Sequence, residues 1–303
     1  MAVPPILVIL GPTASGKSAL AMAVARQTKA EILSVDSMQV YRGMDIGTAK
    51  PTAAERKEIP HHLIDIVEPN ESFTVARFVE LAGGVIAQNR PLIATGGTPL
   101  YYKSLFHGLF EGPSADSEIR DQLRAQTGEE LHLRLTAIDA AAAARIHQND
   151  TRRLIRALEV FELTGKTISS LQTDWQSPAD LHHAVWIGLN WDKSALNHRI
   201  NMRVQQMMAA GWLAETRGLL DHFGELSPTA GKATGYAELI EHLHRKYSLD
   251  EAVEQIKIAT RQLARRQMKW FRRFPNVHWI DGDRPLDEIL PEALAIAAGE
   301  KTS

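Results

Sequence analysis

Short apolar runs alternate with amphipathic segments along the first third of the chain. The runs predict buried strands, and the segments between them predict helices. The expected strands are Ile6–Leu10, Glu31–Val35, His62–Val67 and Pro91–Thr95, and the expected helices are Lys17–Gln27 and Thr74–Gln88. Apolar strands that alternate with helices are typical of a parallel sheet covered on both faces.

The pattern changes near Pro113, where helical spacing continues to about Leu181 without a convincing strand. The helices expected there are Ser117–Gln126, Glu130–Ala137, Ala140–His147 and Thr151–Leu163. Strand character then returns, and the last elements are expected at Val185–Trp191, Ser194–Ala209, Leu213–His222, Tyr236–Lys246, Leu249–Arg273, Val277–Asp281 and Leu286–Ala298. We therefore predict an α/β core from residues 1–112 and 184–303, interrupted by an all-helical insertion domain at 113–183.

Composition narrows the class of protein further. The chain has 303 residues, a formal net charge of −2 and no cysteine. The lack of cysteine excludes disulfides, thiolate catalysis and thiolate zinc sites. Apolar runs are too short for a membrane helix of about 20 residues, and the first residues lack the basic segment of a secretory signal. We expect a cytoplasmic monomer, in which any nucleic-acid contact comes from local basic patches.

Residues 11–18 match the phosphate-binding pattern G-x-x-x-x-G-K-[ST] at every fixed position. They read Gly11-Pro12-Thr13-Ala14-Ser15-Gly16-Lys17-Ser18, follow an apolar strand and open a helix, as the motif requires. The glycines let the backbone wrap a phosphate, and amide N–H groups at the helix N-terminus attract negative charge. Lys17 adds a full positive charge, and Ser18 can hold Mg²⁺. The loop predicts a P-loop NTPase-like core that binds a polyphosphate.

An acidic residue that ends a neighbouring strand organises Mg²⁺ or water in many nucleotide-hydrolysing enzymes. Asp36 follows the strand Glu31–Val35 and fits this position, and Asp65 is a weaker candidate. These residues alone leave open whether a phosphoryl group is transferred, as in a small-molecule kinase or NTPase.

Asp36 opens a longer segment, Asp36–Pro51, with the sequence DSMQVYRGMDIGTAKP. This segment resembles, nearly letter for letter, the one after the second strand of bacterial tRNA dimethylallyltransferases, also called tRNA isopentenyltransferases. Further matching blocks lie at 11–18, 61–65, 96–101, 156–166 and 259–273, so the resemblance covers nearly the whole chain.

The resemblance implies transfer of the dimethylallyl group of dimethylallyl diphosphate to N6 of an adenosine. That adenosine is tRNA position 37, which lies just 3′ of the anticodon. Mg²⁺ is the implied cofactor and diphosphate is the product that leaves. A related branch of enzymes that modify free adenine nucleotides is the nearest alternative.

The resemblance also suggests roles for single residues. Residues 11–18 would hold the diphosphate, and Arg217 matches a family arginine that reaches it from the far side. The lone pair of the adenine amine is conjugated into the ring, so a carboxylate that accepts its proton would assist the attack. We expect Asp36 to be this general base and Gln39 to face an adenine edge. The expected catalytic residues are Lys17, Asp36, Thr98 and Arg217, with Thr98 either a helix N-cap or beside the channel.

Basic residues gather on two segments of this slightly acidic chain. Six of them, with no acidic residue, lie between Ala259 and Arg273, and this concentration favours a phosphate-binding face. Lys232 stands where the family pattern has arginine, so a bidentate contact is lost there. From these clusters and the resemblance, the expected tRNA contacts are Asp36, Ser37, Met38, Gln39, Thr98, Arg120, Arg152, Arg153, Leu154, Ile155, Arg156, Lys232, Arg265, Arg266, Gln267, Lys269 and Arg272.

Overall fold

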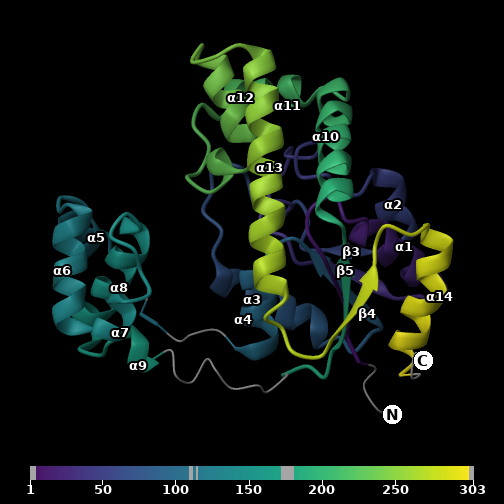
Figure 1. Ribbon diagram of the computed structural model, residues 1–303, viewed down its shortest axis with the longest axis horizontal. Helices are drawn as coiled ribbons and strands as arrows, with labels where there is room; N and C mark the ends of the chain where they lie inside the picture. Colours follow the sequence, from purple (N-terminus) through teal and green to yellow (C-terminus); the bar gives the residue numbers. More distant parts are fainter. Residues whose placement is uncertain (1–4, 109–111, 114, 172–180, 300–303) are drawn as a thin grey trace. The chain divides into compact units, whose positions relative to one another are not determined.

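The computed structural model describes residues 5–108, 112–113, 115–171 and 181–299 (Figure 1). The chain forms two compact units. Met1–Phe106 and Asp180–Ser303 make up the first, which we call the core unit, and His107–Ala179 makes up the second, which we call the helical unit. The pattern along the chain predicts the insertion at 113–183, so both predicted bounds lie a few residues after those of the helical unit. Residues 114 and 172–180 of that predicted insertion lie outside the described residues.

Six parallel strands form the sheet of the core unit, in the spatial order β3-β2-β4-β1-β5-β6. They are β1 (Leu7–Leu10), β2 (Glu31–Ser34), β3 (His61–His62), β4 (Leu92–Gly96), β5 (Val185–Asn190) and β6 (Val277–Asp281). A fully parallel sheet needs helical crossovers between its strands. The predicted α/β class is confirmed, and the phosphate loop follows an inner strand, β1.

The strand expected at His62–Val67 ends much earlier than predicted. Leu63 and Asp65 have φ angles of 62° and 57°, which lie in the left-handed region and break the extended backbone. The N–H of Asp65 donates instead to the carbonyl of Gln39 at 3.1 Å. This segment therefore forms a turn against residue 39.

The helices of the core unit flank the sheet or extend beyond it (Figure 1). They are α1 (Lys17–Thr28), α2 (Ala53–Glu58), α3 (Val75–Ile86), α4 (Pro99–His107), α10 (Lys193–Ala209), α11 (Trp212–Phe223), α12 (Tyr236–Leu243), α13 (Leu249–Phe271) and α14 (Leu286–Ala297), with a 3-10 turn, η2, at Ala230–Lys232. The apolar pattern does not predict α2, because that helix has no buried residue and therefore no apolar face.

Each face of the sheet has its own apolar core, because successive residues of a strand point to opposite faces. Val8 and Leu10 of β1 join a core that includes residues of α3, α4 and α13. Leu7 and Ile9 join a second core with α1 and α14, which lie side by side in Figure 1. The predicted covering of both faces is therefore confirmed.

The helical unit has a separate core. Its helices are α5 (Ser117–Arg124), α6 (Gly128–Ile138), α7 (Ala140–Ala143), α8 (Thr151–Thr164) and α9 (Ile168–Leu171). Leu123, Leu131, Leu135, Leu154 and Leu158 are buried in its centre. Thr127 and Asp150 cap the N-termini of α6 and α8 with their side chains. The helix expected at Ala140–His147 ends early, at Ala143, and the sequence pattern does not predict α9.

A buried carboxylate ties α5 to α8 in the helical unit. The Glu159 side chain is completely buried and forms ion pairs with Arg120 at 2.8 Å and with Arg156 at 2.7 Å. It also accepts the backbone N–H of Asp116 at 2.8 Å. Burial alone would raise the pKa of Glu159, but the two arginines outweigh burial and hold the pKa below its ordinary value.

We expect Glu159→Ala to destabilise the helical unit by about 3 kcal/mol, because it leaves two partly buried guanidiniums without their partner. Hydrogen exchange of the α5 and α8 amides measures this loss, with the amides of β1 and β4 as the control. Since the folded pKa of Glu159 is lowered, its stabilisation is present above the ordinary pKa of 4.5 and is lost as the pH falls through the folded value. Unchanged protection of α5 and α8 in the variant would contradict this role.

Candidate active site

A cavity of about 980 Å³ opens at the carboxyl ends of β1, β2 and β4. The segments that follow these strands line it, namely the phosphate loop, residues 36–39 and residues 95–98. Helices α10 and α13 and the segments 46–51 and 232–234 also contribute to the wall. Open α/β sheets bind their ligands at this edge, so the cavity is the candidate active site.

The phosphate loop has the backbone of an anion-binding turn. Ala14 and Gly16 have φ angles of 65° and 88°, and α1 begins at Lys17 without a side-chain cap. The first N–H groups of α1 are therefore available to a ligand. Of the residues predicted to bind diphosphate, the ones that line the cavity are Thr13, Ala14, Gly16, Lys17 and Ser18, whereas Gly11, Pro12 and Ser15 do not.

Three basic side chains line the cavity around this loop, namely Lys17, Arg199 and Arg203. Burial lowers the pKa of Lys17 to about 8, with the charge of Arg203 acting in the same direction and that of Asp36 opposing both. Burial also lowers the pKa of Arg203, with the charge of Arg199 acting in the same direction. Partly desolvated cations that repel one another are stabilised when an anion enters, so this cluster is suited to a polyanion.

Two contacts fix Arg199 beside the loop. Its Nε donates to the carbonyl of Ala14 at 3.0 Å, and its guanidinium lies 4.5 Å from the centre of the Trp191 ring. Arg203 follows one helical turn later on α10 and has no hydrogen bond to any residue that the structure describes. Its guanidinium is therefore available to a ligand.

The cavity lining includes Arg203 but not Arg217, the residue predicted to reach the diphosphate. Arg217 is exposed on α11 and is not part of the cavity lining, because Thr216 and Leu219 occupy the buried face of that helix. Sequence reasoning missed both arginines of α10, although their spacing of four residues places them on one helix face.

We expect Arg203→Ala to weaken binding of diphosphate in the presence of Mg²⁺ by roughly 10- to 100-fold, since it removes a charged hydrogen-bond donor from a buried site. Arg217→Ala makes the same change on the exposed face of the next helix and is the control, with unchanged affinity. Calorimetric titration of both variants measures the difference. A loss confined to Arg217→Ala would restore the prediction made from the sequence.

Asp36 begins a tight turn at the end of β2. Its Oδ1 accepts the N–H of Met38 at 2.9 Å, while Oδ2 has no hydrogen-bond partner within the described ranges. Thr98 Oγ1 accepts the N–H of Ser37 at 2.9 Å, so the Thr98 hydroxyl holds this turn to the end of β4. A Cβ at Gly97 would lie 3.2 Å from Asp36 Oδ2, so glycine leaves room there for the carboxylate.

The two glutamines predicted to contact tRNA line the cavity, but both of their amides bond within the protein. Gln39 Oε1 accepts the Ser34 hydroxyl at 2.8 Å, and its Nε2 donates to the carbonyls of Thr48 and Ala49. Gln267 Oε1 accepts the N–H of Thr13 at 2.8 Å, and its Nε2 donates to the carbonyl of Gly97 at 2.7 Å. Both amides thus hold cavity segments together, and the role of Gln39 at an adenine edge stays a prediction.

Comparison with known proteins identifies the family. The model for IPP transferase matches residues 39–274, and that for isopentenyl transferase matches residues 4–65. The chain is 44% identical to a tRNA dimethylallyltransferase of Geobacter metallireducens, over 94% of this chain and 95% of that protein. It is 45% identical to one of Anaeromyxobacter dehalogenans, over 96% and 97% of the two chains. This chain belongs to the IPP transferase family. It is accordingly a prenyltransferase enzyme.

Solved structures agree with this assignment. The tRNA isopentenylpyrophosphate transferase of Bacillus halodurans has a TM-score of 0.73 and 39% identity, over 97% of this chain and 96% of that one. A eukaryotic dimethylallyltransferase described as acting on tRNA has a TM-score of 0.84 and 25% identity, over 99% of this chain and 81% of that one. The predicted P-loop NTPase-like fold is thereby confirmed. Within the described ranges, no helix is both long and apolar enough to cross a bilayer.

The basic residues predicted to contact tRNA differ in solvent exposure and in ion pairing in this IPP transferase. Arg265, Arg266, Lys269 and Arg272 are exposed along α13 and its C-cap, and Lys232 lines the cavity. In the helical unit, Arg152 and Arg153 are exposed, and Arg153 pairs with Asp150. Arg120 and Arg156 are partly buried and ion-paired with Glu159.

Two apolar residues of α8 were also predicted to contact tRNA. Leu154 is completely buried in the core of the helical unit, and Ile155 packs against that core. The prediction for the Leu154 side chain is therefore wrong, because the helix turns this residue away from solvent.

The site offers a protein oxygen to a divalent cation whose other ligands would come mostly from a bound diphosphate. Mg²⁺ is usually bound through one or two protein oxygens together with substrate phosphates and water. The Ser18 hydroxyl lines the cavity at the start of α1. Among the described residues, no cluster of three or more histidine or acidic side chains forms a metal site by itself. Ser18 is thus the residue that would hold such an ion.

Proposed function

We propose that this protein, acting as a monomer, transfers the dimethylallyl group of dimethylallyl diphosphate to N6 of adenosine 37 in tRNA. The observation that carries the proposal is a single cavity that holds both an anion site and a carboxylate. Lys17, Arg199 and Arg203 line it together with Asp36. Two relatives are named tRNA dimethylallyltransferases, and a solved neighbour is described as acting on tRNA.

The phosphate loop binds the leaving group in this proposal. The bond between the allylic carbon and the diphosphate oxygen breaks as a bond from N6 to that carbon forms. Negative charge grows on the diphosphate during the step, and fixed donors around it lower the barrier without rearranging. Lys17 and Arg203 supply these charges, and the N–H groups at the start of α1 supply partial ones. The Ser18 hydroxyl would hold Mg²⁺, which would supply further neutralisation of the phosphate charge.

Asp36 takes the proton that N6 loses. Its free Oδ2 is the acceptor, while the bond from Met38 to Oδ1 keeps the carboxylate oriented. An adenine inside an anticodon loop must leave its stack to reach this cavity. The exposed basic residues of α13 and of the helical unit bind the tRNA backbone.

We expect the double variant Arg152→Gln, Arg153→Gln to weaken tRNA binding and to lower its salt dependence by roughly one unit for each lost phosphate contact. Affinity for dimethylallyl diphosphate should stay unchanged, because these residues belong to the helical unit. Arg77→Gln is the control, since Arg77 is exposed and pairs with Glu80 as Arg153 pairs with Asp150. Loss of diphosphate binding without loss of tRNA binding would show that the helical unit has another role.

The direct test is to incubate the protein with dimethylallyl diphosphate, Mg²⁺ and unmodified tRNA, and to analyse the nucleosides by mass. The expected product is N6-dimethylallyladenosine in tRNA, with one diphosphate released for each group transferred. Parallel reactions contain adenosine monophosphate in place of tRNA, or ATP in place of the allylic donor. Prenylated nucleotide or hydrolysed ATP, with no modified tRNA, would favour the nucleotide-prenylating or kinase alternatives.

A further inference from the structure

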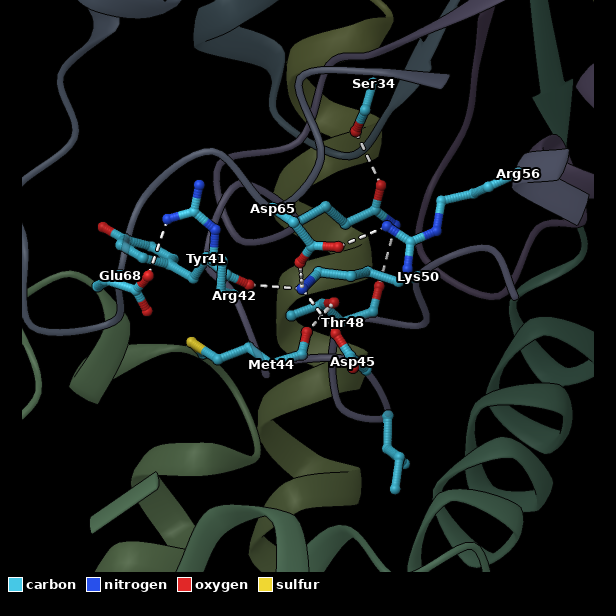
Figure 2. Close-up of polar contacts among 12 residues, drawn as sticks. Ser34, Tyr41, Arg42, Met44, Asp45, Thr48, Lys50, Arg56, Asp65 and Glu68 are labelled. Atoms are coloured by element: carbon cyan, nitrogen blue, oxygen red, sulfur yellow. Dashed lines mark hydrogen bonds and ion pairs between the residues drawn. The ribbon is translucent and has the colours of Figure 1, made fainter. Parts of the chain in front are cut away.

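Lys50 has a buried ammonium group that the proposed chemistry does not use. Its side chain is 2% exposed, and its Nζ donates to the carbonyl of Tyr41 at 2.5 Å, to Asp45 at 2.7 Å and to Asp65 at 2.5 Å (Figure 2). An ammonium has three N–H donors, and all three are used. Lys50 contributes to the cavity lining, yet it has no donor left for a phosphate.

Asp65 links Lys50 to residue 39. One of its carboxylate oxygens pairs with Lys50 and the other with Arg56 at 2.5 Å (Figure 2). Its backbone N–H donates to the carbonyl of Gln39. Burial alone would raise the pKa of Asp65, but the bonds from Lys50 and Arg56 outweigh burial and lower it. The carboxylate is therefore ionised at neutral pH and holds both partners.

Gln39 is held from its other end by the backbone just before Lys50. Its Nε2 bonds to the carbonyls of Thr48 and Ala49, and Ala49 has a φ angle of 49°. Residue 39 is thus bound through its backbone by Asp65 and through its side chain by residues 48 and 49. Lys50 ties these two supports to each other, because it follows Ala49 directly and pairs with Asp65.

We propose that Lys50 and Asp65 are positioning residues that fix the turn from Asp36 to Gln39 and thereby orient the Asp36 carboxylate. The turn starts at Asp36 and is closed by the bond from the Met38 N–H to Asp36 Oδ1, and Met38 directly precedes Gln39. Asp65 does not line the cavity, and Lys50 lines it with no N–H group left to donate to a substrate. The inference rests on the proposed function, in which Asp36 is the base.

The test compares single-turnover rates and substrate affinities of Lys50→Met, Lys50→Arg and the unchanged protein, with dimethylallyl diphosphate, Mg²⁺ and tRNA. Displacing a reacting group by about 1 Å can lower a rate about 10²-fold, and we expect a loss of that order in Lys50→Met. Affinities for both substrates should stay close to those of the unchanged protein, because the phosphate loop and the basic surfaces are intact. Lys50→Arg keeps the charge and should recover part of the rate.

Arg42→Met is the matched control. Arg42 lies on the same segment and pairs with Glu68 (Figure 2), but its side chain is half exposed and it does not line the cavity. The same loss of one positive charge should leave the single-turnover rate unchanged. An equal fall in Arg42→Met would mean that general weakening of the segment, rather than Lys50, explains the loss.

Three results would overturn the inference: an unchanged rate in Lys50→Met, a loss seen only as weaker diphosphate binding, or no recovery in Lys50→Arg. If Lys50→Met does not fold, as judged by circular dichroism, Asp65→Asn decides the matter. This variant keeps the shape and the backbone bond to Gln39 but removes the charge that Lys50 needs, so its rate should fall with substrate affinities kept. Failure of the unchanged protein to modify tRNA would instead refute the proposed function itself.

Discussion

Asp36→Asn is expected to lower the maximum rate of prenyl transfer by ~10²–10⁴-fold, the range typical of a lost general base. The amide keeps the shape of the carboxylate, and its oxygen can still accept the N–H of Met38, so the turn should survive. It cannot take a proton from N6. Both substrates should therefore bind normally while the single-turnover rate falls.

A role for Asp36 in holding Mg²⁺ makes a different prediction. The Asn variant would then bind diphosphate more weakly, and excess Mg²⁺ would restore part of the rate. Titration of Mg²⁺ against the single-turnover rate and against donor affinity separates the two roles. Recovery by metal alone would remove Asp36 as the base and favour a kinase-like use of the phosphate loop.

The phosphate loop and the parallel sheet could be predicted because their signals are local. The spacing of residues 11–18 encodes the loop, and the apolar strands encode a sheet that is buried on both faces. Asp36 could be found for the same reason, since it directly follows a predicted strand. The cavity brings these segments together as expected.

The differences between expectation and structure come from features that depend on the whole fold. Arg203 and Arg217 both lie on helices, and the sequence does not say which helix faces the phosphate loop. Helix α10 does, because the cavity lining includes Arg203 and not Arg217. Gln267 bonds to Thr13, which is 254 residues away in the chain, and no local pattern reports such a partner. The positive φ angles of Leu63 and Asp65, just after β3, likewise belong to a turn that bonds to Gln39, and no local pattern reports this partner.

Lys17→Met should cause the other large loss, because Lys17 provides the full positive charge within the phosphate loop. Removing one fixed donor from a developing negative charge costs about 3–4 kcal/mol of transition-state stabilisation, which corresponds to a rate roughly 10²–10³-fold lower.

This loss should not come from unfolding. Burial lowers the pKa of Lys17 to about 8. Keeping this side chain charged at neutral pH therefore makes the folded state less stable relative to the unfolded state. Its replacement by an apolar side chain of similar length should leave the free energy of unfolding unchanged or higher, as denaturant titration would measure. Lys57→Met, an exposed lysine on α2, is the control for the change of charge. A near-normal rate in Lys17→Met would exclude the phosphate loop as the site of the leaving diphosphate. A lower stability together with a lower rate would assign Lys17 to the fold instead.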